Sequence, residues 1–238
     1  MKIFILLKIL IILSNFQNFL FAGAPPLNKE MLPDAPYEFI KTNHIIIGVE
    51  WKKSSLTDVL PSKLSGVSTI TGGINIFNSR KKQSFSPLSG AYGWVDLPGE
   101  DKKEKFIIFS MYGPNATINK VMKSVYSLKS EIGSNKVTLI NNKAVATSSI
   151  NGKNVLIFSG INSENCVKAS GQELLVSSLS DDGKVYKKFN WTTKNQCNIS
   201  PDQIELKEVL KKFEIKKMIW AKTLEDSNVI IEKPVSNK

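Results

Sequence analysis

The sequence has 238 residues, of which 42% are hydrophobic, and a formal net charge of +11, values that suit a globular protein with an ample core. The basic residues are almost all lysine, with Arg80 as the single arginine, whereas recognition of phosphates and bases favours the arginine fork. We therefore interpret the charge as a solvated surface and predict no nucleic-acid partner. His44 is the only histidine and there is no CxxC pair, which argues against a zinc site.

The first 24 residues have the order of a secretory signal peptide. Lys2 and Lys8 lie before and within an apolar run, and small residues follow up to Ala24. A membrane anchor is the alternative, but it needs about 20 uninterrupted apolar residues, and polar residues at positions 15, 17 and 18 interrupt this run. We predict cleavage near Ala22 or Ala24, a secreted or periplasmic location, no stable membrane insertion, and a single domain over residues 25–238.

Two cysteines, Cys166 and Cys197, occur in the predicted mature chain. In an oxidising compartment an even, minimal count favours one disulfide. It would close a loop of about 30 residues and stabilise the fold by about 3 to 4 kcal/mol in the loop-entropy model. Two buried free thiols are the alternative.

Most of the mature chain is predicted to form strands. Apolar runs bounded by polar, glycine or proline residues indicate strands at 44–51, 72–77, 92–97, 106–112, 136–140, 144–149, 155–158, 173–179, 185–191, 216–224 and 229–232. Asn141-Asn142, Asn151-Gly152 and Asp182-Gly183 are hairpin turn signals.

Three segments have helix signals. A short helix is expected to start at Ser54 and to stop at Pro61. The clearest helix follows Pro114, with one apolar face formed by Ile118, Val121, Met122 and Val125. A third is expected after the cap Ser200-Pro201, with the apolar positions Leu206, Val209, Leu210 and Phe213. The fold class is therefore α+β, rich in β-structure, with two or three helices.

The order of these motifs resembles the acetoacetate decarboxylase-like superfamily. The element Pro36-Tyr37-Glu38-Phe39, a strand, and the segment 55–64 around Pro61 resemble its N-terminal part. Tyr92-Gly93-Trp94, the helix and loop at 115–129, and the end at 213–232 agree with its later elements. The resemblance implies an antiparallel β-barrel or cone with a small enclosed pocket, no cofactor, and a small organic acid or carbonyl compound as ligand. A homo-oligomer is left open.

In the decarboxylases of that superfamily a lysine forms a Schiff base with a β-keto acid. It belongs to a Pro-Lys-Lys element after the helix, which is matched here by Tyr126 to Ser130. In that register Leu128 takes the position of the nucleophile and Lys129 that of its neighbour; a shift of one residue would make Lys129 the nucleophile. Tyr126 and Asp96 are then candidate proton-handling partners. A surface lysine and a solvated turn acid are the alternative interpretations of Lys129 and Asp96.

Other working residues of the superfamily are replaced in this chain. The active-site arginine falls near Thr42, the strand glutamate on Trp94, and a second acid near Asn75. Without the arginine, a carboxylate substrate lacks its bidentate clamp.

Three functions remain open from the sequence. The first is a Schiff-base lyase or decarboxylase that acts on a small keto acid or carbonyl compound. The second is a non-catalytic protein on the same fold, in which Trp94, Tyr92 and Phe77 line an apolar ligand pocket. The third is a secreted surface protein, which rests on the basic charge and on sequons at Asn115, Asn190 and Asn198.

Overall fold

The computed structural model describes residues 34–64, 66–79, 88–98, 104–114, 116–180 and 183–237. The predicted signal peptide and its cleavage sites lie outside these residues, as do Asn115 and Asp182. Within the described ranges, no helix is both long and apolar enough to cross a membrane.

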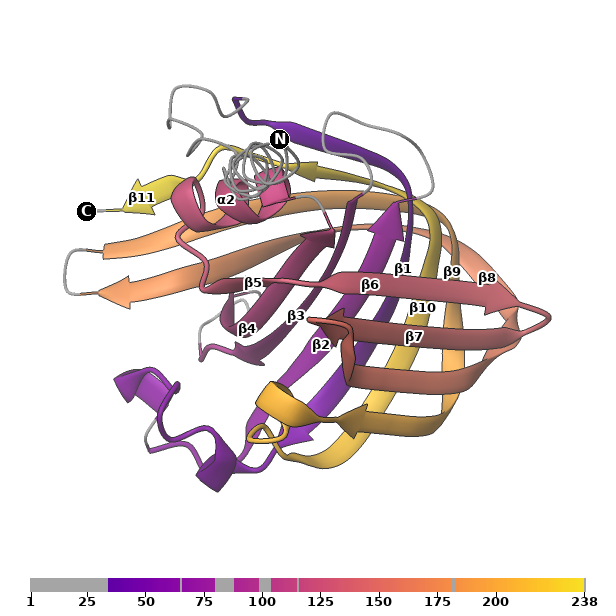
Figure 1. Ribbon diagram of the computed structural model, residues 1–238, viewed down its shortest axis with the longest axis horizontal. Coiled ribbons are helices and arrows are strands. Elements are labelled where there is room, and N and C mark those ends of the chain that lie inside the picture. The colour runs from indigo at the N-terminus through magenta and orange to yellow at the C-terminus, as the bar shows by residue number, and fades with distance from the viewer. Residues whose placement is uncertain are drawn as a thin grey trace, which may run out of the picture. The chain divides into compact units, whose positions relative to one another are not determined.

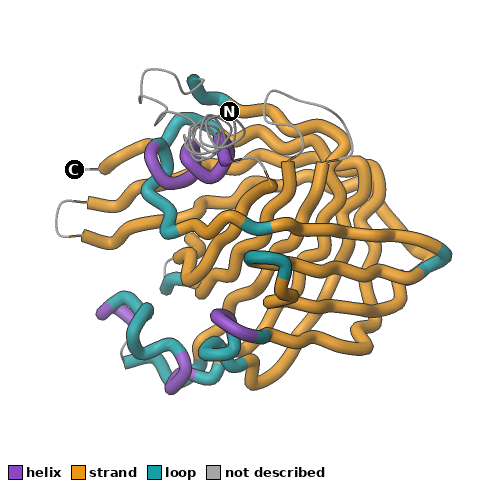
Figure 2. The backbone as a smooth tube through the Cα atoms, viewed as in Figure 1, coloured by secondary structure: helices purple, strands orange, loops and turns teal. Residues whose placement is uncertain are grey.

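Eleven strands form one sheet in the order β11-β9-β10-β1-β2-β3-β4-β8-β7-β6, and β5 pairs with β4 outside this path. Strands dominate the described chain (Figure 2). Their bounds are β1 Tyr37–Trp51, β2 Ile70–Ser79, β3 Leu88–Asp96, β4 Glu104–Pro114, β5 Ser130–Ile132, β6 Ser134–Ile140, β7 Lys143–Ile150, β8 Lys153–Ser180, β9 Gly183–Leu206, β10 Ile215–Ile231 and β11 Val235–Asn237.

A ring of strands closes because β8 pairs with both β4 and β9. The ring runs β9, β10, β1, β2, β3, β4, β8 and back to β9. This confirms the predicted barrel or cone. The pairings within the ring are antiparallel, except that β4 and β8 are parallel. The ring is therefore not closed by an antiparallel meander alone.

The long hairpin β8–β9 has two halves with different neighbours (Figure 1). Its base continues the layer of β6 and β7, which crosses in front of β1 to β3 in Figure 1. Its far half pairs with β4 and β10 and completes the ring. The sequence predicted separate short strands in this region, whereas the structure joins them into two continuous strands. The hairpin turns expected at Asn141-Asn142 and Asn151-Gly152 are confirmed, since all four residues have positive φ.

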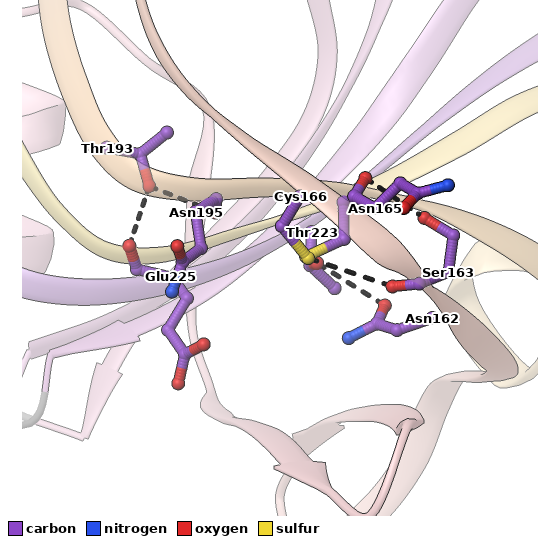
Figure 3. Close-up of a disulfide and its surroundings, with 9 residues drawn as sticks. Asn162, Ser163, Asn165, Cys166, Thr193, Asn195, Thr223 and Glu225 are labelled. Atoms are coloured by element: carbon purple, nitrogen blue, oxygen red, sulfur yellow. Dashed lines mark hydrogen bonds between the residues drawn. A yellow bond between two sulfur atoms is a disulfide. The ribbon is translucent and has the colours of Figure 1, made fainter.

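The disulfide Cys166–Cys197 lies between the two halves of the hairpin, with a Cα–Cα distance of 4.4 Å (Figure 3). It confirms the predicted pairing and rules out two free thiols. Along β8, the register with β9 shifts just before and just after Cys166. Nearby hydroxyls join strands as well: Thr193 donates to the carbonyl oxygen of Glu225 at 2.6 Å (Figure 3). The disulfide therefore fixes the register where the hairpin passes from one layer to the next.

The wall from β1 to β4 is buried on both faces, so alternate residues of β1 meet different surroundings. Ile45, Ile47 and Val49 belong to the main apolar core together with Val137 and Phe158 of the β6–β8 layer. Side chains of the opposite parity, such as His44, point into the ring. Burial on both sides explains why the segment 44–51 is almost continuously apolar.

One α-helix is present in the described chain, α2 at Ala116–Ser124, and it buries Ile118, Val121 and Met122 as predicted. The predicted helix after Ser54 is replaced by 3-10 turns at Lys53–Ser55 and Ser62–Leu64.

The predicted helix after Ser200 is wrong. Residues up to Leu206 continue β9, because Ile204 and Leu206 pair with Phe158 and Leu156 of β8. Only Glu208–Leu210 forms a 3-10 turn. Leu210 and Phe213 still enter the core, so the apolar pattern identified buried residues but not their backbone conformation.

Candidate functional site

A small cavity of about 30 Å³ lies inside the ring. Most of its lining is apolar and comes from β1, β2, β3, β9, β10 and α2, while its polar residues are Thr42, His44, Asn75, Tyr92 and Tyr112. A second cavity of about 20 Å³ shares His44, Asn75 and Tyr92 and adds Glu173 and Trp191 from the hairpin. The shared side chains therefore stand between two small voids.

Strand register brings the shared side chains together. His44 pairs with Phe77, and Asn75 pairs with Ile46 on one side and with Tyr92 on the other. Paired residues of antiparallel strands present their side chains on the same face. Neighbours in the chain such as Ile45, Ile74 and Ile76 belong to the apolar core, so the sequence shows no polar stripe.

The polar side chains form one hydrogen-bonded chain. Thr42 Oγ1 lies 2.8 Å from His44 Nε2 and 3.0 Å from the carbonyl oxygen of Ser227. His44 Nδ1 lies 3.2 Å from Asn75 Oδ1, and Asn75 Nδ2 donates to the Tyr92 hydroxyl at 2.9 Å. The chain links three neighbouring strands and the end of β10.

Burial keeps this chain uncharged. It lowers the pKa of His44 to about 4, against an opposing contribution from the Asn75 hydrogen bond. The neutral imidazole then carries one proton. With Asn75 Oδ1 as an acceptor, that proton sits on Nδ1 and Nε2 carries none; the single Thr42 hydroxyl proton can go to Nε2 or to the carbonyl oxygen of Ser227, but not to both.

Two tyrosine hydroxyls complete the polar lining. Burial raises the pKa of Tyr92 and of Tyr112, so both hydroxyls stay protonated. The Tyr92 oxygen accepts from Asn75, but neither hydroxyl donates to another residue in the part of the chain that the structure describes. The cavity therefore holds two O–H donors with free protons in largely apolar surroundings.

The residues expected from the Schiff-base chemistry lie elsewhere. Lys129 is exposed, and its carbonyl oxygen accepts a hydrogen bond from Ser110. Leu128 is buried at 4% exposure, and Tyr126 is buried and donates its hydroxyl proton to the carbonyl oxygen of Glu232. None of the three lines the cavity. The catalytic role of Lys129 and the supporting role of Tyr126 stay predictions. Neither residue lines the cavity.

Asp96 and Trp94 are also outside the cavity. Asp96 accepts hydrogen bonds from Trp94 Nε1 at 3.1 Å and from Thr71 Oγ1 at 2.9 Å. It lines a separate groove of about 420 Å³. Trp94 is buried, with Lys105 Nζ 4.4 Å above its ring centroid. Of the three predicted ligand-lining aromatics, Tyr92 and Phe77 line the cavity and Trp94 does not.

His44, Thr42, Asn75 and Tyr112 are cavity residues that the sequence did not identify as a group. Thr42 and Asn75 drew notice only as replacements of charged family residues, and both line the cavity. Nothing marked His44 except that it is the only histidine. Among the described residues, no three His, Cys, Asp or Glu side chains gather as they would around a metal ion.

Fold and site together define a closed, β-rich cone whose interior holds a small cavity with neutral hydrogen-bond donors. No protein-family model matches the sequence, and no curated protein matches it in sequence. Solved structures do match in shape. Acetoacetate decarboxylase from Legionella pneumophila superposes over 92% of this chain and 93% of its own, with a TM-score of 0.70 and 13% identity.

Two further structures agree. An acetoacetate decarboxylase covers 92% of this chain and 96% of its own at a TM-score of 0.67 and 11% identity. The enduracididine biosynthesis enzyme MppR, complexed with pyruvate, covers 91% of this chain and 95% of its own, with a TM-score of 0.63 and 7% identity. The chain therefore has the acetoacetate decarboxylase-like fold, in a strongly divergent sequence, and the resemblance found in the sequence is confirmed at the level of the fold.

Proposed function

We propose that this chain is an exported, non-catalytic protein that binds a small uncharged carbonyl compound inside its ring of strands. The observation that carries the proposal is the pair of protonated tyrosine hydroxyls, Tyr92 and Tyr112, with free protons in an apolar cavity. A carbonyl oxygen accepts two hydrogen bonds and supplies no proton, so it matches this pair. The Asn75 and His44 side chains behind Tyr92 hold its hydroxyl in place.

The charge of the cavity supports an uncharged ligand. Among the residues that the structure describes, no lysine or arginine lines either void, and His44 is neutral at pH 7. Within that described lining Glu173 is the one charged residue, and it is paired with Lys105 at 2.8 Å. A buried carboxylate without a partner is costly, so an anion gains less here than a neutral molecule of the same shape. At about 10 to 15 Å³ for each water-sized group, the larger void holds two or three such groups and the smaller one or two, so a ligand of four to six non-hydrogen atoms extends through both voids only when the side chains between them move.

The same lining argues against covalent chemistry. A Schiff base requires an amine within reach of the ligand carbonyl. In the register suggested by the resemblance that position is Leu128, and the neighbouring Lys129 is exposed. A Schiff-base lyase remains the alternative function, and it would need Lys129 to reach the cavity.

A matched pair of ligands tests the proposal. MppR is complexed with pyruvate, which makes pyruvate the natural reference, and butane-2,3-dione has a methyl group where pyruvate has its carboxylate oxygen. Isothermal titration calorimetry should show binding of the dione and binding of pyruvate at least about tenfold weaker. Tyr92→Phe should weaken binding of the dione about tenfold. Tyr126→Phe is the control, since that hydroxyl lies outside the cavity. Tighter binding of pyruvate would overturn the proposal.

Trapping with borohydride separates binding from catalysis. Incubation with pyruvate or acetoacetate, reduction and intact-mass measurement should give no added mass on the folded protein. A reduced adduct on Lys129 would replace the binding proposal with the Schiff-base alternative.

Export is tested separately. N-terminal sequencing of the protein recovered from the periplasm or the medium should begin at Gly23 or Pro25. Recovery of the full-length chain from membranes would contradict the predicted signal peptide.

A further inference from the structure

Two tryptophan rings lie around a lysine of β10, which is opposite Ile46 of β1. Lys222 Nζ lies 5.6 Å from the ring centroid of Trp191 and 5.4 Å from that of Trp220. Trp220 is 44% exposed, whereas Lys222 and Trp191 are half-buried. The lysine therefore stands at the boundary between the ring interior and solvent.

Backbone glycines position the two tryptophans. Gly48 pairs with Trp220, and a Cβ atom on Gly48 would lie 2.3 Å from the Trp220 ring. Gly171 pairs with Trp191, and a Cβ atom there would lie 2.6 Å from that ring. Both rings thus pack on backbone where no side chain intervenes. Such packing holds them in place before any ligand arrives, which lowers the entropic cost of binding.

The Lys222 ammonium has unused donors. It donates to Gln196 Oε1 at 3.3 Å, and no other described residue accepts from it or forms an ion pair with it. An ammonium group has three N–H donors, so two remain for a ligand. Burial lowers the pKa of Lys222, an effect that Glu173 opposes and Lys105 reinforces. A bound anion would compensate for that burial.

The neighbouring charges leave a surplus of one positive charge. Glu173 is held by Lys105, with side-chain exposures of 20% and 16%, so its charge is largely balanced. Lys222 is the unbalanced member of the three. A ligand with a single negative charge matches this balance, whereas a polyanion would meet Glu173.

We propose that Lys222, Trp191 and Trp220 form a binding site for an aromatic monocarboxylate. The carboxylate would accept from the two free N–H groups of Lys222, and the flat ring of the ligand would pack against Trp220, which is 44% exposed. This site is separate from the neutral cavity and does not depend on the function proposed for it. The two sites share only Trp191, which also lines the smaller void.

Fluorescence titration of the tryptophans with benzoate, benzamide and acetate tests the site. Benzoate should quench or shift the emission in a saturable manner, and benzamide and acetate should each bind at least about tenfold more weakly, because one lacks the charge and the other the ring. Added salt should weaken the binding of benzoate, since the charge of Lys222 is partly exposed to solvent. Equal binding of benzoate and benzamide would overturn the proposal.

Matched variants locate the site. Lys222→Gln should weaken the binding of benzoate about tenfold, and Trp220→Leu should weaken it several-fold. Lys217→Gln removes the same charge from an exposed position on the same strand and should leave binding unchanged. Circular dichroism and the Tm of each variant check folding. If benzoate binds wild type and Lys222→Gln equally, the assignment is wrong; binding of butane-2,3-dione by the same variant shows independently whether the cavity function stands.

Discussion

The neutral cavity and the charged group around Lys222 lie next to each other on the same wall of strands. Ile46 pairs with Asn75 on one side and with Lys222 on the other. In the cavity, full burial leaves only groups that can be neutral, and it holds His44 in its uncharged form. Around Lys222, the partly exposed side chains of Lys105 and Glu173 form an ion pair at 2.8 Å, and burial lowers the pKa of Lys222. The comparison teaches that depth inside the ring decides which chemistry a side chain can offer.

The largest expected effect concerns the hairpin that covers both regions. Its far half carries Glu173 and Trp191, and the disulfide Cys166–Cys197 fixes the register behind them. Replacing both cysteines by serine should lower the free energy of unfolding by about 3 to 4 kcal/mol, measured by urea denaturation of the oxidised proteins. Both benzoate and dione binding should weaken together. A loss confined to one ligand would show that the two regions do not share this support.

The second expected effect is a pH dependence that belongs to the cavity. The folded-state pKa of His44 is about 4, below the ordinary value near 6.5. Between these values the unfolded chain binds more protons, so stability is full above about pH 6.5 and is lost as the pH falls towards 4. The contribution is about 3 kcal/mol by linkage.

The single histidine makes this measurement direct. The imidazole NMR resonance should titrate near pH 4 in the folded protein, and His44→Gln should be less sensitive to acid than wild type between pH 6.5 and 4. Titration of His44 near pH 6.5 would contradict the neutral, enclosed cavity.

The third expected effect comes from removing the link between His44 and Tyr92. Asn75→Leu leaves the imidazole Nδ1 and the tyrosine hydroxyl without these partners in a buried site. The cost should be about 2 to 3 kcal/mol, measured by urea denaturation. Asn228→Leu, at an exposed position on β10, is the control and should change stability by under about 0.5 kcal/mol. Equal effects of the two changes would mean that the hydrogen-bonded chain is not structurally important.

The smallest expected effect concerns a solvated charge pair, which extends the comparison to the surface. Lys52 Nζ lies 2.7 Å from Glu214 Oε2, and the two side chains are 53% and 55% exposed. Lys52→Gln should change the free energy of unfolding by less than about 0.5 kcal/mol, because solvent and salt screen the pair. A cost comparable to that of Asn75→Leu would contradict the link between exposure and energetic weight.

Much of the fold could be predicted from local patterns. The strands, two hairpin turns, the helix after Pro114 and the disulfide were identified because each depends on neighbours in the sequence or, for the cysteines, on a count of two. The helix expected after Ser200 failed for the opposite reason. Its apolar spacing is real, but pairing of β9 with β8 offers the same side chains a place in the core while satisfying the backbone.

The candidate site was less accessible to prediction. Tyr92 and Phe77 were identified as lining residues, but the hydrogen-bonded chain was not, because Thr42, His44, Asn75 and Tyr92 come from three strands and are separated by residues of the other face. Trp94 was placed in the pocket from the resemblance, yet it lies over Gly73 and under Lys105. Only the register of β2 against β1 and β3 shows which of these side chains meet.

The sequence by itself determined that the chain is rich in strands, joins its two cysteines and resembles the acetoacetate decarboxylase-like superfamily; its secretory signal peptide stays a prediction. The tertiary structure alone decided that β8 closes a ring between β4 and β9, that Leu128 is buried while Lys129 faces outward, and that an uncharged cavity adjoins a lysine between two tryptophans. The physical reason is that periodicity and composition depend on the secondary structure and burial that a local segment favours. Burial, ionisation and reach depend on which distant strands pair and in which register.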